Sequence, residues 1–408
     1  MTRMRSLACA ARPVAGLVGV LLLSAATGGC GGGDAAAPQP FPDATRAQLS
    51  DALNRSRTAL DIPGVIVSLY IPGEGLWETA VGIEDKQTQK PIVAGMHTRI
   101  GSITKTFTVT AILQLADDKK LKLDDPVSKY LDFVPNGDNI TLRQMANMTS
   151  GLYSYTKDDP WVERLQREPY RVYTARELVD AGFNHNPSPY SFTPPGSSID
   201  YSNTNTVLLG LVVEKVSGMK VQDFFAERIY RPLGLKDTSW PTDTNIPVPF
   251  SHGYTKQTPT GAEADATFFN PSWGDAAGQL ISNLEDLKKW CKALGEGTLL
   301  SPEMQKERLT WAPFGPPTFR YGLGIGYYNG WIGHTGSLPG YNTGVYYLPA
   351  KKAVLVIQTN TDIPRIIDPG PPPVQEEPVN GVFREIAKIV TPDNVPDGHD
   401  FTDSDLPE

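Results

Sequence analysis

The sequence predicts an α+β fold, within the broad α/β class, whose antiparallel sheet is built from both ends of the chain. Strand-like segments lie at 64–82 and return after residue 320, whereas helix-like and loop-like segments fill the interval from about 120 to 265. Helical patterns accompany both groups of strands, at 43–60 and 382–390. We therefore expect a sheet flanked by the two terminal helices, with an all-helical insertion beside it.

The first residues predict an export signal. Arg3, Arg5 and Arg12 form a basic segment that contains no acidic residue. Residues 14–26 are apolar or small, a stretch too short to span a bilayer but typical of a signal-peptide core. We therefore predict a signal peptide over 1–29 and an exported protein of the periplasm or cell envelope.

Two cleavage sites are compatible with this signal. The Ser-Ala-Ala at 24–26 suits an ordinary signal peptidase. The Thr-Gly-Gly-Cys at 27–30 resembles a bacterial lipobox, although Thr27 stands where leucine is preferred. We favour lipidation at Cys30, followed by a flexible tether over 30–42 that is rich in Gly, Ala and Pro. Cys291 would then be the one thiol of the body, and we expect a small core residue there.

Composition and motif searches exclude several classes of function. The formal net charge of the 408 residues is −8, which argues against nucleic acid as a partner because phosphate binding needs a cationic surface. The five histidines form no H-E-x-x-H pair, and neither a phosphate-binding loop nor a G-x-S-x-G elbow occurs. We therefore expect no metal and no cofactor.

The elements of the sheet follow from apolar patterns bounded by turn residues. A turn at 72–75 joins the first two strands into a hairpin, and a Pro-Ala-Lys-Lys turn at 349–352 joins the last two. The Gly-rich segment 333–340 is also strand-like. The other expected strands span 64–71, 76–82, 321–328, 345–348 and 353–358.

The helices are indicated by periodic apolar residues and by capping residues. A capping-box signature at 282–285 precedes a helix that runs to about residue 294. The Pro-rich tract 368–378 predicts a surface loop, and the acidic tail 392–408 predicts disorder. The other expected helices span 43–60, 102–117, 203–216, 221–230 and 382–390.

A Ser-x-x-Lys motif is the first candidate for chemistry. A serine needs a base to become a nucleophile, and a lysine three residues later on a helix lies on the same face, one turn away. Only Ser102 stands at the start of a helix that looks buried, so we assign Ser102 as the nucleophile and Lys105 as its base. For the other two copies we expect solvated loops without catalysis. These copies are Ser154/Lys157 and Ser217/Lys220.

Two further motifs complete the candidate site. Tyr201 stands just before a helix, where its phenol could relay a proton to a leaving group, and Asn203 could bind a substrate amide. The segment His334-Thr335-Gly336 is followed by Ser337 on a Gly-rich strand that can approach a ligand closely. The motifs fall before, within and after the helical insertion, as a cleft between the sheet and the helices requires.

This set of residues resembles the penicillin-recognising serine hydrolases. The resemblance is carried by Ser102-Ile103-Thr104-Lys105, by Tyr201-Ser202-Asn203 and by His334-Thr335-Gly336, and it extends from about 60 to 360. It is strongest to secreted D-alanyl-D-alanine carboxypeptidases and class C β-lactamase-like proteins. It implies the β-lactamase/transpeptidase-like fold, with a domain over 43–391 divided into a sheet part, 43–100 and 275–391, and a helical part, 101–274.

The resemblance also implies a role for each residue of the site. Ser102 would form an acyl-enzyme with Lys105 as base, and Tyr201 would carry the proton to the leaving group. The backbone N–H groups of Ser102 and Ser337 would stabilise the oxyanion. The residues implied to contact substrate are Asn203 at the acyl-side amide, His334, Thr335, Gly336 and Ser337 along the strand, and Trp273 in the cleft wall.

The chain departs from this family in three places. The segment 321–324 is followed by Ile-Gly-Tyr-Tyr, without the arginine that anchors a terminal carboxylate in the carboxypeptidases. His334 stands where most β-lactamases have lysine, and a histidine is mostly neutral at pH 7. Met148 replaces a commonly polar residue. An ester substrate would need no carboxylate anchor.

We therefore expect an exported serine hydrolase that acts on D-Ala-D-Ala-type peptides or carboxylic esters. Its partner would be a small-molecule or peptide substrate, for example a peptidoglycan stem peptide, and the protein would be a monomer that contacts a membrane only through Cys30. One alternative is a β-lactamase. Another is a non-catalytic envelope lipoprotein that keeps the fold to bind a ligand.

Overall fold

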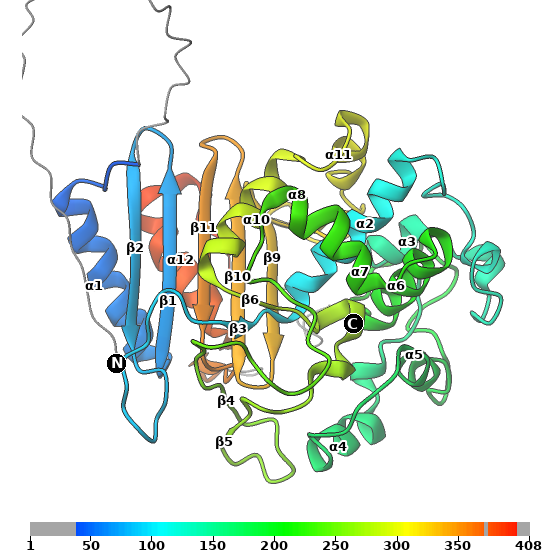
Figure 1. Ribbon diagram of the computed structural model, residues 1–408, viewed down its shortest axis with the longest axis horizontal. Helices are drawn as coiled ribbons and strands as arrows, with labels where there is room; N and C mark the ends of the chain where they lie inside the picture. Colours follow the sequence, from blue (N-terminus) through cyan, green and yellow to red (C-terminus); the bar gives the residue numbers. More distant parts are fainter. Residues whose placement is uncertain (1–37, 371–373, 398–408) are drawn as a thin grey trace, which may run out of the picture. The chain divides into compact units, whose positions relative to one another are not determined.

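Strands from both ends of the chain lie side by side in one antiparallel sheet (Figure 1). The structure is a computed structural model that describes residues 38–370 and 374–397, so the predicted signal peptide and Cys30 lie outside the described residues. The order of the strands is β2-β1-β11-β10-β9-β8-β7, which confirms the predicted α+β fold. These strands are β1 (Gly64–Ile71), β2 (Gly75–Gly82), β7 (Phe319–Tyr321), β8 (Gly326–Tyr328), β9 (Trp331–Leu338), β10 (Tyr341–Leu348) and β11 (Ala353–Thr359).

The junction between the two ends of the chain is the pairing of β1 with β11. Val65 pairs with Thr359 and Tyr70 with Val354. Since successive side chains of a strand point to opposite faces, Val65 belongs to the core formed with the terminal helices, while Ile66 belongs to the core on the other face. β1 lies between β2 and β11 and is buried on both faces, which explains its nearly continuous apolar sequence.

Helices cover both faces of the sheet. α1 and α12 pack against each other on one face, and α10 packs on the other, against β10 and β11. Most of the other helices lie to the right of the sheet in Figure 1, and of these α2 to α8 fall within residues 101–274. The helices are α1 (Asp43–Ala59), α2 (Thr104–Asp117), α3 (Leu142–Ala146), α4 (Asp159–Arg167), α5 (Ala175–Phe183), α6 (Asn203–Ser217), α7 (Val221–Phe225), α8 (Arg231–Leu233), α9 (Asp275–Gly278), α10 (Leu284–Glu296), α11 (Pro302–Arg308) and α12 (Pro378–Val390).

The predicted strand at 321–328 is wrong, because two short strands, β7 and β8, form a tight hairpin there. Gly324 in the connection has φ +64°, and a Cβ on it would lie 2.6 Å from Cβ of Val109 in α2. The close approach of α2 therefore requires glycine and interrupts the strand. The predicted capping box is also displaced by one residue, since Asn283 caps α10 by accepting a hydrogen bond from the N–H of Asp286.

Ordered structure also replaces part of the predicted loop and tail. Within the tract predicted as a loop, β13 (Val374–Glu376) pairs with β12 (Arg365–Asp368). Residues 392–397 are not disordered: the indole N–H of Trp331 donates to the carbonyl oxygen of Asn394, whose side-chain amide donates to the carbonyl oxygen of Asn329. The rest of the predicted tail lies outside the described residues. Two more pairs of short strands are β3 (Thr98–Arg99) with β6 (Ile281–Ser282), and β4 (Tyr254–Thr255) with β5 (Ala264–Asp265).

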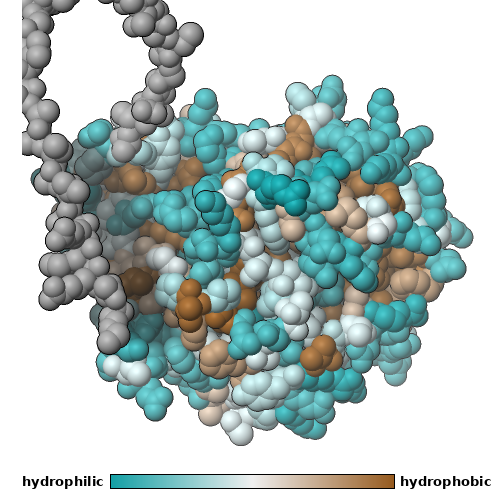
Figure 2. Space-filling model, viewed as in Figure 1, coloured by the Kyte–Doolittle hydropathy of each residue, from teal (hydrophilic) through white to brown (hydrophobic). Residues whose placement is uncertain are grey.

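The surface is polar with scattered apolar residues. Figure 2 shows a mostly hydrophilic face with small hydrophobic areas. Among the described helices, none combines the length and the apolar character that crossing a bilayer requires. Cys291 is buried in α10 as a free thiol, as the sequence predicts.

Candidate active site

Ser102 lies in a 3₁₀ turn, Gly101–Ile103, that leads directly into α2. Every residue of α2 from Thr104 to Leu115 is buried, so the helix is a rigid support for the turn. The turn packs against β9, where a Cβ on Gly336 would lie 2.0 Å from the carbonyl oxygen of Ile100. Glycine at 336 therefore allows the strand to reach the backbone of the nucleophile turn.

Lys105 points from the first turn of α2 at Ser102. Its Nζ lies 2.9 Å from Oγ of Ser102 and 2.9 Å from the carbonyl oxygen of Ala277. The side chain is fully buried, and Nζ lies 4.8 Å from the centre of the Tyr201 ring. These contacts hold the amine beside the hydroxyl, where its uncharged form can accept a proton.

Tyr201 enters the same site from the loop before α6. Its ring is 3% exposed and meets the ring of Tyr321 edge-on, with 6.2 Å between the ring centroids. The preceding residue, Asp200, forms an ion pair with Lys157 and accepts a hydrogen bond from Ser191. The loop that presents the phenol is therefore anchored by a charged pair next to it.

Asn203 is the first residue of α6, and a second Ser-x-x-Lys motif holds it. Its backbone N–H donates to Oγ of Ser154 at 3.0 Å, and its side-chain amide donates to Oγ1 of Thr156 at 2.9 Å. Ser154 is fully buried, so the prediction of a solvated loop is wrong there. This copy of the motif supports Tyr201 and Asn203 through the Ser154 hydroxyl and the Lys157 ion pair.

The third Ser-x-x-Lys copy lies at the C-terminal end of α6. The Ser217 hydroxyl donates to the carbonyl oxygen of Val213 and accepts from the N–H of Met219. Lys220 is exposed and pairs with Glu214. Neither residue belongs to the cavity that contains Ser102.

Strand β9 forms one wall of the site with Thr335, Gly336 and Ser337, but His334 does not line the cavity. His334 is 1% exposed, with Nε2 2.8 Å from Oη of Tyr321 and Nδ1 against the carbonyl oxygen of Thr335. Burial, and secondarily the charge of Lys105, lowers the pKa of His334 to about 3. The expected contact of His334 with substrate is therefore wrong: strand alternation turns this neutral ring away from Thr335 and into the protein.

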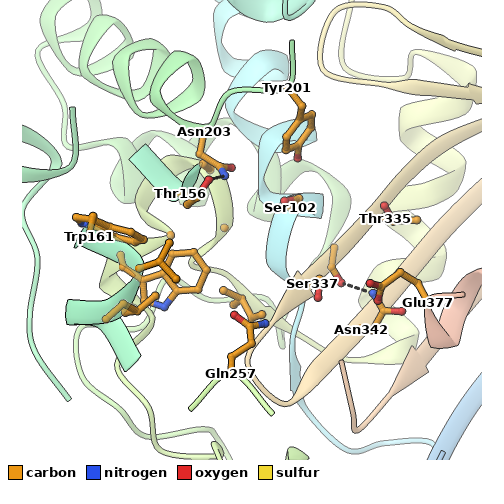
Figure 3. Close-up of a pocket in the computed structure, with 18 residues that line it drawn as sticks. Ser102, Thr156, Trp161, Tyr201, Asn203, Gln257, Thr335, Ser337, Asn342 and Glu377 are labelled. Carbon is orange, nitrogen blue, oxygen red and sulfur yellow. Dashed lines mark hydrogen bonds between the residues drawn. The ribbon is translucent and has the colours of Figure 1, made fainter. Parts of the chain in front are cut away.

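The site is a cavity of about 230 Å³ with Ser102 in its middle (Figure 3). In the figure, Trp161 and Thr156 lie on one side of Ser102, and Thr335, Ser337 and Glu377 lie on the other. Trp273 lines the cavity as predicted, and its carbonyl oxygen accepts a hydrogen bond from Oη of Tyr155. The cavity therefore extends to both sides of the nucleophile.

The backbone amides of Ser102 and Ser337 come close together. A Cβ on Gly336 would lie 2.8 Å from N of Ser102, and a Cβ on Gly101 would lie 2.7 Å from N of Ser337. Gly101 has φ +51°, which glycine adopts without strain. The two amides that the family resemblance implies for an oxyanion hole are therefore neighbours beside the Ser102 hydroxyl.

Several lining residues were not predicted. The apolar end of the cavity is formed by Trp161, Val162 and Leu165 of α4, a helix that the sequence did not predict. Asp158 caps α4 by accepting from the N–H of Trp161 at 3.0 Å, and proline follows in the first turn. The Asp-Asp-Pro sequence at 158–160 is the local helix-start signal from which α4 could have been predicted. The other unpredicted lining residues include Thr156, Gln257, Leu338, Asn342 and Glu377.

In the described residues, no group of three or more His, Cys, Asp or Glu side chains is placed to hold a metal ion. The ionisable side chains placed beside the Ser102 hydroxyl are Lys105 and Tyr201. The hydroxyl of Ser102, the amine of Lys105 and the phenol of Tyr201 together suit acyl transfer.

Solved structures with a similar fold include an amidohydrolase and an amidase. A D-stereospecific amidohydrolase from Streptomyces sp. is 34% identical, with a TM-score of 0.71, covering 79% of this chain and 95% of that chain. The D-amino acid amidase from Ochrobactrum anthropi SV3, solved with L-phenylalanine, is 26% identical, with a TM-score of 0.67, covering 78% and 91%.

Curated relatives match only part of their own length. Penicillin-binding protein 4* of Bacillus subtilis (strain 168) is 26% identical over 314 residues, which are 71% of this chain and 66% of the relative. Protein flp of Staphylococcus aureus (strain MRSA252) is 28% identical over 238 residues, 57% of this chain and 45% of the relative. The Beta-lactamase family model matches residues 49–368. The chain belongs to the Beta-lactamase family, whose members are generally serine hydrolases, and the predicted resemblance to the penicillin-recognising enzymes is thereby confirmed.

Proposed function

We propose that this protein hydrolyses amide or ester bonds through an acyl-enzyme at Ser102. The observation that carries the proposal is the 2.9 Å contact between Oγ of Ser102 and Nζ of Lys105, inside a cavity that Tyr201 also lines. D-Ala-D-Ala-type peptides and carboxylic esters are the two leading substrate classes. The Streptomyces relative named above as a D-stereospecific amidohydrolase supports an acyl donor of D configuration.

The chemistry follows from the placement of three side chains. Lys105 takes the proton of the Ser102 hydroxyl as Oγ attacks the substrate carbonyl carbon, and the amides of Ser102 and Ser337 stabilise the resulting oxyanion. Tyr201 delivers a proton to the leaving amine or alcohol as its bond to carbon breaks. Water then attacks the acyl-enzyme, giving up one proton to the same groups, and the acid leaves as Ser102 regains its hydrogen.

The charge of the cavity determines how we rank the substrate classes. Among the described residues that line the cavity, none is Lys or Arg, and His334 is a buried, neutral ring that does not line it. A free terminal carboxylate or a penicillin carboxylate would therefore meet no cationic anchor in the cavity. We place β-lactam hydrolysis below hydrolysis of amides and esters.

Labelling with a fluorophosphonate probe tests the nucleophile directly. The wild type should be labelled and Ser102→Ala should not, because the probe reacts with an activated serine hydroxyl. Ser217→Ala is the matched control, since it removes a serine from a Ser-x-x-Lys copy outside the cavity and should keep full labelling. Equal labelling of wild type and Ser102→Ala would overturn the proposal and favour a protein that binds without catalysis.

Substrate class is tested with three compounds on the purified protein. These are a short-chain nitrophenyl ester, an N-acylated D-Ala-D-Ala peptide and a chromogenic cephalosporin. We expect turnover of the ester and of the D-Ala-D-Ala peptide, and little of the cephalosporin. Rapid cephalosporin hydrolysis with no turnover of the other two would replace the proposal with a β-lactamase.

We propose further that the protein acts in the cell envelope, anchored by a lipid on Cys30. The basic and apolar sequence of 1–29 and the Cys at its end support this proposal. Fractionation of expressing cells should find the wild type with membranes and Cys30→Ala in the soluble envelope fraction. Recovery of the wild type in the cytosol would contradict export.

A further inference from the structure

One side chain gives the cavity a negative charge. Of the lining residues that the structure describes, Glu377 is the only one with a charged side chain, and it lies on the Thr335 and Ser337 side of Ser102 (Figure 3). The opposite end is formed by apolar side chains, among them Trp161, Val162 and Leu165. A substrate that spans Ser102 therefore has one end in an apolar environment and the other end beside a carboxylate.

The position of Glu377 is fixed by hydrogen bonds rather than left to a surface loop. It immediately precedes α12, whose N–H at Val379 donates to Oδ1 of Asn342 at 2.9 Å. The side-chain amide of Asn342 donates in turn to the carbonyl oxygen of Gly336. Asn342 thus joins the start of α12 to the strand that forms the cavity wall, and Glu377 is half-buried at this junction.

The start of a helix can attract an anion, so the N–H groups of α12 need to be accounted for. Pro378 has no N–H, and the N–H of Val379 is used by Asn342. The N–H groups of Asn380 and Gly381 donate to the carbonyl oxygen of Glu377 itself. The backbone N–H donors of the first turn are therefore occupied and cannot bind an anionic substrate group. The Glu377 carboxylate faces the cavity instead.

We infer that Glu377 is a specificity-determining residue that favours substrates with a positively charged group at the β9 end of the cavity and disfavours a carboxylate there. This inference rests on the proposed function and refines it. Among D-alanyl substrates, those whose leaving group carries an ammonium or a neutral amide would be preferred to those that end in a free acid. A fixed charge in a cleft shielded from water is worth about 10-fold to 100-fold in such a comparison.

Three substrates with one skeleton test the inference. They are N-acetyl-D-alanyl-D-alanine, its C-terminal amide, and the N-acetyl-D-alanyl derivative of (2R)-1,2-diaminopropane acylated at the 2-amino group, in which CH₂NH₃⁺ replaces the carboxylate. For the wild type, kcat/KM should rise from carboxylate to amide to ammonium. The ratio between the ammonium and carboxylate compounds should fall by about tenfold or more in Glu377→Gln, and it should invert in Glu377→Lys.

A matched control separates the site from net charge. Glu385→Gln changes the charge of α12 by the same amount, and its side chain pairs with Lys388 outside the cavity. It should leave the substrate ratio unchanged. The ratio of the wild type should also shrink as salt is raised, because added ions screen the interaction.

The outcomes distinguish this inference from the proposed function. Labelling of Ser102 without any charge preference, or the same ratio in wild type and Glu377→Gln, would overturn the inference and leave the function standing. If Ser102 is not labelled, calorimetry can still measure how tightly Ser102→Ala binds each of the three compounds. The order of these affinities then tests the charge preference without turnover. Tightest binding of the carboxylate compound there would overturn the inference independently of turnover.

Discussion

Nε2 of His334 lies 2.8 Å from Oη of Tyr321, and the centroid of the His334 ring lies 6.2 Å from that of Tyr201. The ring of Tyr321 meets that of Tyr201 edge-on, so this hydrogen bond supports the phenol that faces the nucleophile. The histidine of the His-Thr-Gly motif is therefore a positioning residue behind Tyr201.

The burial of His334 predicts a loss of stability in acid. Its pKa is about 3 in the folded protein and about 6.5 when exposed, so between these values the unfolded chain binds the additional proton. The stability that this difference supplies is present above pH 6.5 and is lost as the pH falls toward 3. Between pH 6.5 and 5 the loss is about 2 kcal/mol. Denaturant unfolding of wild type and His334→Gln at both pH values should show a smaller loss in the variant, and equal losses would contradict the prediction.

Asp362 predicts the opposite dependence in an overlapping pH range. This buried carboxylate accepts hydrogen bonds from N of Gly340, Oγ1 of Thr255 and Nε2 of Gln257, and burial raises its pKa from 3.8 to about 6. Since the folded protein holds the proton between these values, stability should decrease by about 3 kcal/mol as the pH rises from about 3.8 through 6.

The measurement for Asp362 is the free energy of unfolding at pH 4 and pH 7 for wild type and Asp362→Asn. The variant removes the titrating group, so its stability relative to wild type should be higher at pH 7 than at pH 4. A relative stability that does not change between the two pH values would show that the buried carboxylate does not titrate as expected.

Tyr201→Phe should separate amide from ester hydrolysis. The phenol is placed to protonate the leaving group, and an amine needs that proton more than a nitrophenolate does. We expect kcat to fall by about 10²-fold or more on a D-alanyl amide and much less on a nitrophenyl ester. Equal losses on both substrates would assign Tyr201 to a step common to both, such as activation of Ser102.

Gly336→Ala should disrupt the nucleophile turn. Its Cβ would lie 2.0 Å from the carbonyl oxygen of Ile100 and 2.8 Å from N of Ser102, so β9 and the turn would have to separate. We expect kcat/KM to fall by about 10²-fold or more, the usual effect of displacing an oxyanion-hole donor. Gly95→Ala is the matched control, because nothing lies within 4 Å of a Cβ there. Full activity of Gly336→Ala would show that the strand can move without affecting Ser102.

Lys105→Ala should leave a nucleophile without its base. Acylation by a nitrophenyl ester should slow by about 10²-fold or more, since general bases contribute at least that much. Stopped-flow measurement of the acylation burst isolates this step. Lys220→Ala, at the exposed third motif copy, should acylate at the wild-type rate; a comparable loss in both variants would point to a general effect on charge.

Local patterns predicted the elements, while the functions of individual side chains depended on tertiary contacts. The hairpin at 349–352 and the helix that follows Ser102 could be predicted because each depends on neighbouring residues. The orientation of His334 could not, because it depends on which face of β9 meets the 3₁₀ turn. Glu377 enters the cavity only through the contact of Asn342 with α12, and no local pattern indicates that contact.

The same distinction explains the second Ser-x-x-Lys copy. Ser154 is followed by a polar, acidic stretch that favours a loop when taken alone. In the fold, its hydroxyl accepts from the N–H of Asn203, a residue far along the chain, and this contact buries it. The role of each Ser-x-x-Lys copy therefore depends on the long-range partners of its serine more than on the motif itself.

The pairing of Val65 with Thr359 also determines when this protein can complete its fold. During synthesis, β1 has no partner on its inner side until the ribosome has released β11, and contacts so distant in sequence make folding slow. A chain that stops before residue 353 would leave the edge of β1 open to pairing with other chains, which promotes aggregation. The β9 wall of the cavity is also made late, so the site around Ser102 is complete only after residue 338 has been synthesised.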